Sequence, residues 1–190
     1  MLCLPFESCK DLEEQGVYYS GWLHGHFITN LFVFAYDGRI IKAVIYVSGS
    51  VHDSTLADWG DVYEELEELY NSTGGKCAVD SAFGMHATPF LIKSGKDITR
   101  AKDAREVVLI RESTSVRQAA EWGMRAIQGS FSRLKDAIRF EVDGGTKRKI
   151  MLKLAVLLYN FCLEHVGLNQ IRNTYCPEWS KDAPYFVTPI

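Results

Sequence analysis

Residues 31–47 run Leu31-Phe32-Val33-Phe34-Ala35-Tyr36, then Asp37-Gly38-Arg39, then Ile40-Ile41-Lys42-Ala43-Val44-Ile45-Tyr46-Val47. The two outer runs are rich in β-branched and aromatic residues, which favour strands. Asp-Gly between two such runs is a strong hairpin signal, because both residues tolerate positive φ. We therefore predict an antiparallel hairpin, which residues 18–29 lead into and Gly49-Ser50 ends.

The chain after this hairpin alternates between helix and strand patterns. A helix is predicted over Asp61–Tyr70, because Val62, Leu66 and Leu69 share one face and glutamates flank it. The glycine-containing segment 71–75 ends this helix. A short apolar strand follows and closes on Asp80 in Cys77-Ala78-Val79-Asp80-Ser81-Ala82-Phe83. This alternation predicts an α/β fold.

The second half of the chain is predicted to be mainly helical. Residues 84–112 are expected to be a loop with a short helix near 101–108. Ser115-Val116-Arg117-Gln118 fits a capping box that opens a helix reaching Asp136. A strongly apolar helix over Lys149–Val166, ended by Gly167, is expected to lie across the sheet. Residues 168–190 are expected to be an irregular tail.

Composition is that of one folded domain spanning residues 1–190. The chain has 190 residues, of which 47% are apolar and 24% charged. The longest apolar run, near residues 154–162, is too short and too interrupted to span a bilayer, and no signal peptide is expected at the N-terminus. Five widely spaced cysteines without a C-x-x-C pair indicate reduced thiols in a cytosolic or nuclear compartment.

Charge is distributed unevenly along the chain. Residues 1–90 carry 4 basic and 13 acidic side chains, whereas residues 91–153 carry 15 basic and 8 acidic ones. A basic segment of this kind suits a polyanionic partner. The alternative is a solvated charged face, and on this signal alone the solvated face is slightly favoured.

Two carboxylates are placed where phosphodiester chemistry needs them. Asp80 ends a strand, the position at which α/β sheets place their reactive groups. Glu121 lies on the basic helix in phase with Arg117 and Arg125. Mg²⁺ takes few oxygen ligands from a protein, so that phosphate oxygens complete its coordination shell. The alternatives are a turn residue at Asp80 and a surface ladder of ion pairs at Glu121, worth about 0.3–0.5 kcal/mol per pair.

A third carboxylate, Asp53, lies between the hairpin and the next helix. It is either the N-cap of that helix or a side chain that points into the same pocket as Asp80. His52 beside it suits an outer partner of a metal ligand. Nucleophilic catalysis by cysteine has no support, because none of the cysteines has a His or Asp at a diagnostic spacing.

Several short motifs, in order, resemble one known family. They comprise Tyr18-Tyr19-Ser20-Gly21-Trp22-Leu23-His24-Gly25-His26, Gly49-Ser50-Val51-His52-Asp53-Ser54, Asp80-Ser81-Ala82-Phe83, Arg117-Gln118-Ala119-Ala120-Glu121-Trp122-Gly123-Met124-Arg125-Ala126, Leu158-Tyr159-Asn160 and Gly167-Leu168-Asn169-Gln170-Ile171-Arg172-Asn173. Together these motifs resemble the DDE endonuclease domain of PIF/Harbinger-type transposases, especially the forms common in fungal genomes. Each motif is weak, but the series covers almost the whole chain.

The resemblance implies an RNase H-like mixed sheet flanked by helices. It implies Asp80 and Glu121 as the second and third catalytic carboxylates and as ligands of Mg²⁺ or Mn²⁺, with Asp53 an additional metal ligand. The family's first catalytic Asp precedes the stretch that resembles residues 2–6, so we expect this chain to lack it, to lack the first catalytic strand and to be inactive as given. Ser48 and Tyr159 replace a Pro and a His that are common in the family.

The resemblance also implies the partners of the protein. DNA would be the substrate and would contact Arg117, Arg125 and Arg133, in a nuclear or a cytoplasmic and nuclear protein. A separate DNA-binding partner protein and an oligomer fit this picture, and a membrane does not. The alternative function is a domesticated, non-catalytic module that retains the fold for interaction with DNA or protein.

Overall fold

A computed structural model of the chain describes residues 1–7, 12–80, 82–83, 88–94, 103–138, 145–167 and 169–176. The chain divides into two compact units. Unit 1 comprises residues 1–51 and 122–190, and unit 2 comprises residues 52–121. The long helix α4 (Ala104–Ser130) contributes to both. The predicted mixed α/β class is confirmed, whereas the RNase H-like topology and the single domain stay predictions.

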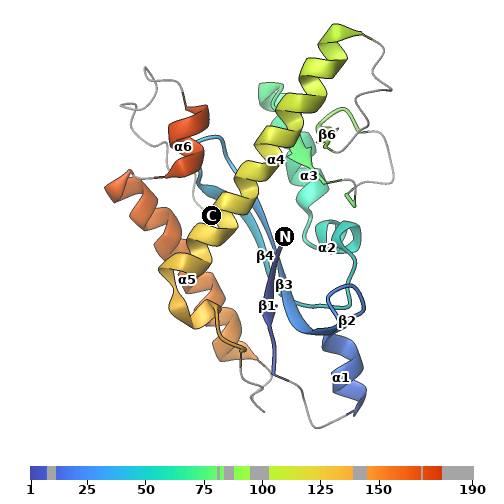
Figure 1. The fold of residues 1–190 in the computed structure, drawn as a ribbon, viewed down its shortest axis with the longest axis vertical. Coiled ribbons are helices and arrows are strands. Elements are labelled where there is room, and N and C mark those ends of the chain that lie inside the picture. The colour runs from blue at the N-terminus through green and yellow to red at the C-terminus, as the bar shows by residue number, and fades with distance from the viewer. Residues whose placement is uncertain are drawn as a thin grey trace. The chain divides into compact units, whose positions relative to one another are not determined.

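Unit 1 is built on an antiparallel sheet whose central strand is β3 (Gly25–Phe34) (Figure 1). The strands β4 (Ile40–Ser48), β1 (Leu2–Pro5) and β2 (Tyr19–Ser20) all pair with β3, and the helix α1 (Leu12–Tyr18) precedes β2. The predicted hairpin is thus confirmed as β3–β4. Its turn relies on Gly38 at φ 87°, while Asp37 instead pairs with Arg39 across the loop at 2.7 Å.

A buried asparagine ties three of these strands together. Asn30 is fully buried in β3 at an irregularity of the β3–β4 register. Its side-chain nitrogen donates to the carbonyl of Leu2 in β1 at 3.3 Å, and its side-chain oxygen accepts from the amide of Tyr46 in β4 at 3.0 Å. Tyr46 has a φ of 61°, which places its amide out of the regular ladder. The Asn30 amide therefore replaces ladder bonds that the backbone does not make there.

The helix α5 (Thr146–Val166) packs against β4 and supplies much of the core of unit 1. The predicted apolar helix and its end at Gly167 are confirmed. Asn160 accepts from the amide of Ile40 and donates to its carbonyl, both at 2.9 Å. Two hydrogen bonds to one backbone residue hold the helix to the start of β4. The core residues of this unit are Leu2, Leu4, Phe6, Ile28, Ile40, Ile127, Leu134, Ile138, Leu152, Ala155, Val156, Tyr159 and Leu163.

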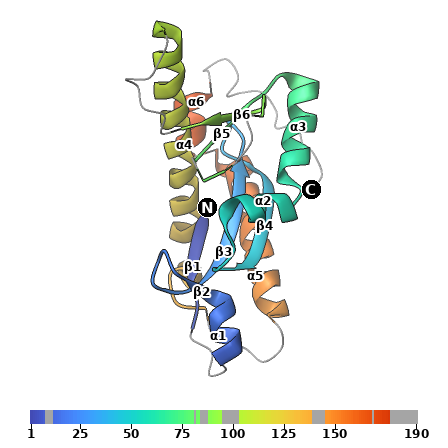
Figure 2. The same cartoon turned by 90° about the vertical axis from the view of Figure 1, so that its right-hand side faces the viewer.

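Unit 2 contains the helices α2 (Asp53–Trp59) and α3 (Val62–Thr73), the strands β5 (Cys77–Val79) and β6 (Leu91–Lys93), and the first part of α4. The predicted helix near residues 61–70 and the strand before Asp80 are confirmed. Leu69 is exposed, so the buried face of α3 is formed by Val62 and Leu66. Figure 2 shows β5 beside β6, and their pairing is parallel.

The prediction of a helix that starts at Ser115 is wrong. The helix α4 is continuous from Ala104 to Ser130 and is followed by a 3₁₀ turn, η2 (Ser132–Leu134). Asp103 caps it by accepting from the amide of Glu106 at 2.8 Å. This Asp-x-x-Glu pattern, a capping-box variant, outweighs the Ser115 pattern because nothing interrupts the helix between the two.

Two other segments differ from the sequence predictions. β6 lies in a region predicted to be a loop, part of which falls outside the described residues. The tail contains a helix, α6 (Gln170–Tyr175), because the Asn169 side chain caps the amides of Ile171 and Arg172. Residues 177–190 of the predicted tail lie outside the described residues. None of the helices in the described part of the chain is both long and apolar enough to cross a membrane.

The Asn30 interaction yields a stability prediction. Asn30→Ala should lower the free energy of unfolding by about 3 kcal/mol, because it removes two hydrogen bonds, one to the carbonyl of the buried Leu2 and one to the amide of the half-buried Tyr46. Chemical denaturation measures this loss. Asn173→Ala, at an exposed position on α6, should change the value by less than about 0.5 kcal/mol. Equal stabilities of the two variants would contradict the role assigned to Asn30.

Candidate active site

Asp53 lies at the start of α2, directly after the short connection that follows β4. His52 is the N-cap of this helix, and its Nδ1 accepts from the amide of Ser54 at 3.4 Å. The interpretation of Asp53 as the N-cap is therefore wrong. Asp53 is instead the first helical residue, and its side chain is half-buried.

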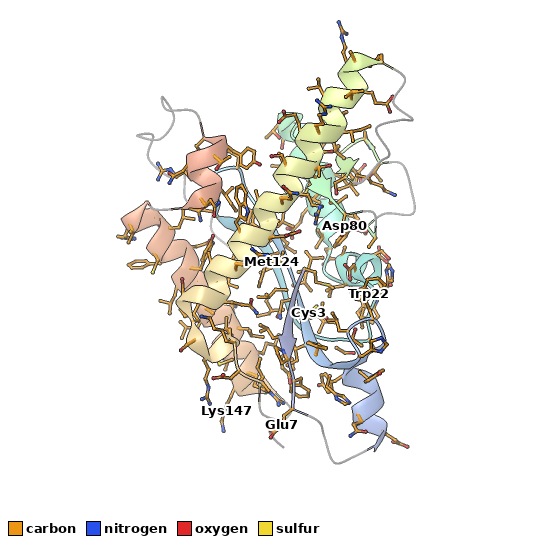
Figure 3. All side chains as sticks on the ribbon, in the orientation of Figure 1. Cys3, Glu7, Trp22, Asp80, Met124 and Lys147 are labelled. Carbon is orange, nitrogen blue, oxygen red and sulfur yellow. The ribbon has the colours of Figure 1, made fainter. Side chains whose placement is uncertain are left out.

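Asp80 follows the last residue of β5 and is exposed (Figure 3). The carbonyl of Asp80 accepts from the amide of Phe83, so the chain turns immediately after the strand. The next strand, β6, runs parallel to β5 and ends on the same side. Asp80 therefore occupies the carboxyl end of a parallel pair, as its position in the sequence predicted.

Asp53 and Asp80 lie close enough for their charges to interact. Burial raises the pKa of Asp53 above its ordinary value of 3.8, and the negative charge of Asp80 adds to this increase. His52 opposes the increase but does not cancel it. A half-buried carboxylate whose charge is opposed by a second, exposed carboxylate is stabilised by a proton or a cation.

Glu121 makes a different interaction. Its Oε1 accepts from Arg117 Nη1 at 2.9 Å, as one of the two pairs of the predicted ladder. Within the part of the chain that the structure describes, no three His, Cys, Asp or Glu side chains form a group that could hold a metal ion. The structure thus brings Asp53 and Asp80 together and pairs Glu121 with Arg117. The catalytic and metal-binding roles of these three residues stay predictions.

Asp53 and Asp80 nevertheless suit a divalent cation, both in the chemical type of the ligands and in their number. Mg²⁺ prefers oxygen ligands and is commonly held by one or two carboxylates, with water and phosphate oxygens completing its shell. Both donors here are carboxylates, and the raised pKa of Asp53 reflects in part the repulsion between them, which a cation would relieve. A third protein ligand is not needed for binding of this type.

The basic residues predicted to contact DNA are distributed along α4 and the turn after it. Arg117 belongs to unit 2, whereas Arg125 on α4 and Arg133 on η2 belong to unit 1. The Arg125 and Arg133 side chains are exposed, and that of Arg117 is partly exposed. Their accessibility is compatible with phosphate contacts, and their role in DNA binding stays a prediction.

Cysteine chemistry has no support in the structure either. Cys3, Cys77, Cys162 and Cys176 have reduced thiols, and Cys9 lies outside the described residues. Burial raises the pKa of the Cys77 thiol to about 11. Cys77, the nearest cysteine in sequence to Asp80, is therefore protonated at neutral pH and is a poor nucleophile.

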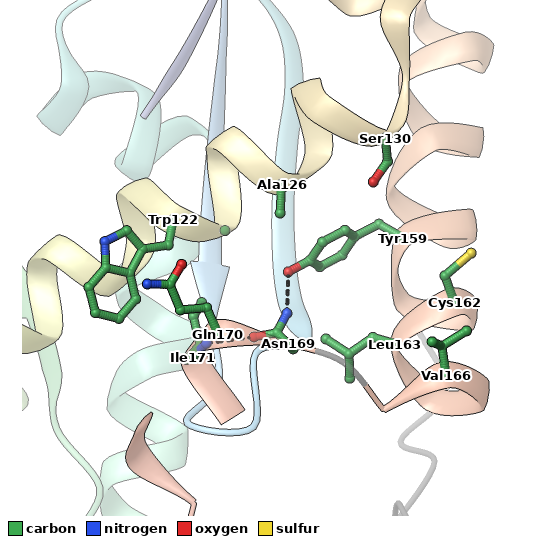
Figure 4. Close-up of a pocket in the computed structure, with 11 residues that line it drawn as sticks. Trp122, Ala126, Ser130, Tyr159, Cys162, Leu163, Val166, Asn169, Gln170 and Ile171 are labelled. Atoms are coloured by element: carbon green, nitrogen blue, oxygen red, sulfur yellow. Dashed lines mark hydrogen bonds between the residues drawn. The ribbon is translucent and has the colours of Figure 1, made fainter. Parts of the chain in front are cut away.

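A small cavity in unit 1 lies outside this site (Figure 4). It has a volume of about 220 Å³ and lies between the second part of α4, α5 and α6. The hydroxyl of Tyr159 accepts from Asn169 Nδ2 at 2.8 Å beside it and donates to the carbonyl of Gly38 at 3.3 Å. The described residues that line the cavity include no carboxylate and no basic side chain, so this cavity does not suit phosphodiester chemistry.

Sequence reasoning missed the polar residues that hold these elements in place. Asn30, Asp103 and Asn169 each bind backbone groups of another strand or of a helix end. Two of them left a signal: Asn30 interrupts an apolar strand, and Asp103 precedes Glu106 at capping-box spacing. The partners of Asn30 are distant in the sequence. The partners of Asp103 and Asn169 are backbone amides that need a cap only if a helix starts there.

The Asp53 site yields a pH prediction. Because the pKa of Asp53 is raised on folding, the folded chain retains a proton that the unfolded chain releases, and stability falls as pH rises above 3.8. Asp53→Asn should remove this loss, so the variant should gain stability relative to the wild type at about pH 7 but not at about pH 3. Denaturation at both pH values tests this, with Asp58→Asn, exposed on the same helix, as the control. A gain of equal size at both pH values would contradict the prediction.

Comparison with protein families gives a match over most of the chain. Residues 2–160 match the model of the DDE superfamily endonuclease family. No curated protein and no solved structure matches the chain significantly. Members of this family act on DNA and generally use divalent metals. Because the match covers most of the chain, the protein belongs to the DDE superfamily endonuclease family.

Proposed function

We propose that this protein derives from a transposase and that its Asp53–Asp80 site serves metal-dependent cutting and joining of DNA phosphodiesters. The observation that carries the proposal is the electrostatic interaction between Asp53, at the start of α2, and Asp80, at the end of a parallel strand pair. Family membership supports the reaction class. A bound Mg²⁺ or Mn²⁺ would neutralise phosphate charge and lower the pKa of the attacking water.

The two carboxylates are proposed to have different roles. Asp80 is exposed, so its oxygens are accessible to an ion that also contacts a DNA phosphate. Asp53 is half-buried and fixed in the first turn of α2, so it would position the ion from the protein side. The products would be a cut strand after attack by water, and joined DNA after attack by a 3′-hydroxyl.

Glu121 is proposed as the third catalytic carboxylate, released from its arginine when DNA binds. A phosphate competes well for a guanidinium, because the two make charge-assisted hydrogen bonds in a fixed geometry. If Arg117 turned toward a phosphate, the Glu121 carboxylate would lose its present partner and become available as a ligand. In this proposal Glu121 stays paired with Arg117 until DNA binds.

The finer assignments are also proposals. The PIF/Harbinger type rests on the motifs quoted above. Location in the nucleus and action with a separate DNA-binding partner protein follow from that type. The basic segment 91–153 is proposed to contact the DNA, through Arg117, Arg125 and Arg133 among others.

One observation favours a second function, that of a non-catalytic module that binds DNA or protein. Glu121 is engaged by Arg117, and the described residues contain no group of three metal-ligating side chains. A chain that has lost catalysis can keep its fold and basic surface for binding alone. Metal binding and DNA cleavage, measured separately, distinguish the two functions.

The metal proposal predicts the behaviour of three variants. Mn²⁺ should bind the wild type in titration calorimetry, and Asp53→Asn or Asp80→Asn should weaken binding by roughly ten-fold or more, since each removes the negative charge of a direct ligand. Asp58→Asn should bind like the wild type. Equal affinity of all four proteins would show that the ion binds elsewhere.

These proteins, with Glu121→Gln added, separate the two functions in a DNA nicking assay. Mn²⁺-dependent conversion of supercoiled to open-circular DNA, lost in Asp80→Asn and in Glu121→Gln, supports the endonuclease. Mn²⁺ binding without nicking supports the non-catalytic module. Nicking that survives both substitutions would exclude this site as the catalytic one.

DNA binding should depend on salt through the basic segment. Replacing Arg117, Arg125 and Arg133 together by Ala should weaken binding and reduce the slope of log affinity against log salt, by about 0.9 for each phosphate that the protein no longer neutralises. Replacing the same three by Lys should retain the slope, because the charges remain. Fluorescence anisotropy over a salt series measures both, and an unchanged slope in the Ala variant would contradict the assignment.

A further inference from the structure

The helix α5 is apolar on two opposite faces. One face is buried in unit 1 through Leu152, Val156, Tyr159 and Leu163, among others. On the opposite face Ile150, Leu154, Leu157 and Phe161 are 61%, 52%, 43% and 55% exposed. Single exposed apolar residues are ordinary, but a continuous stripe along one helix marks an interaction surface.

The exposed stripe has the spacing of a helix–helix seam. Its four residues are separated by four, three and four positions, the heptad pattern of residues that meet a partner helix. The next positions of the same pattern are Lys147 before the stripe and Glu164 after it, and both side chains are exposed. Figure 3 labels Lys147 at the first turn of α5. The seam therefore has an apolar centre, a basic end and an acidic end.

We propose that this face binds the α5 helix of a second copy of the chain, antiparallel and about a two-fold axis. In one alignment every seam position meets a suitable partner. Leu154 lies opposite Leu157 of the second copy, Ile150 opposite Phe161, and Lys147 opposite Glu164. The apolar centre is self-complementary, as a two-fold interface requires.

The charged residues at the two ends of the seam favour an antiparallel over a parallel pair of helices. In the antiparallel pair both ends carry a Lys147–Glu164 ion pair between the copies. A parallel pair would instead place Lys147 against Lys147 and Glu164 against Glu164, and like charges at facing positions oppose association. A second copy is thus the occupant for which both the apolar pattern and the charge pattern fit.

The size of the seam sets the expected affinity. Stable protein interfaces bury about 1,200 Å² or more, and a single pair of helices meeting over about three turns supplies less. We therefore expect a reversible dimer with a Kd on the order of micromolar. Sedimentation velocity over a concentration series should show a monomer that converts to a dimer.

Cross-linking tests the direction. A zero-length carbodiimide reagent joins a lysine amine to a carboxylate only in direct contact. Lys147 and Glu164 are about 25 Å apart along one helix, so a link between them forms only between two copies. Mass spectrometry of mixed isotope-labelled and unlabelled chains should detect a Lys147–Glu164 link that contains one chain of each kind. A dimer without this link overturns the antiparallel arrangement.

Substitutions test the seam itself. Leu154→Lys with Leu157→Lys should weaken the dimer at least about thirty-fold, because it removes the apolar centre and adds like charges. Both positions are exposed, so thermal unfolding should be unchanged at concentrations where the wild type is monomeric. The matched control is Val108→Lys with Leu109→Lys, since both are exposed apolar residues on α4. This control should dimerise like the wild type.

A charge exchange completes the test. Lys147→Glu alone should raise the Kd roughly five-fold, because both end pairs become repulsive, and the addition of Glu164→Lys should restore it. A parallel dimer would show the same Kd for all three proteins. A chain that stays monomeric at high concentration, or a dimer that the Leu154 and Leu157 substitutions leave intact, overturns the proposal.

Discussion

The buried amide of Asn30 is the interaction on which unit 1 depends. It lies in the central strand and binds the backbone of both neighbouring strands, β1 and β4, where the ladder is irregular. A slip of one residue in strand register moves every side chain to the opposite face of the sheet. By binding both neighbours at one position, Asn30 opposes such a slip. This register determines which face of the sheet carries the core residues Leu4 and Ile28. It therefore also determines the face against which α5 packs.

Two other asparagine side chains also connect elements of this unit. Asn160 makes two hydrogen bonds to Ile40, and Asn169 caps α6 while it binds the hydroxyl of Tyr159. Burial raises the pKa of that hydroxyl, so it stays protonated and can donate to Gly38. The motif residues Tyr159, Asn160 and Asn169 therefore serve the packing of α5 and α6.

The carboxylates of unit 2 show a different balance of forces. Asp53 and Asp80 are held together by the fold despite their mutual repulsion, whereas Glu121 is neutralised by Arg117. Two like charges within interaction range cost stability. The Glu121–Arg117 ion pair has no comparable cost in stability, because its charges are opposite and partly exposed and its members are one helical turn apart.

The sequence by itself determined the elements whose signals are local. The β3–β4 hairpin followed from two apolar runs around Asp-Gly, α5 from its long apolar stretch and Gly167, and Asp80 from its place after a short strand. Only the tertiary structure decided the rest, because those features depend on distant partners. The register at Asn30 needs Leu2 and Tyr46, and the charge interaction of Asp53 with Asp80 joins residues that are distant in the sequence. The single helix α4 replaced two predicted segments because its true cap is Asp103, and no local pattern ranks one capping site above another.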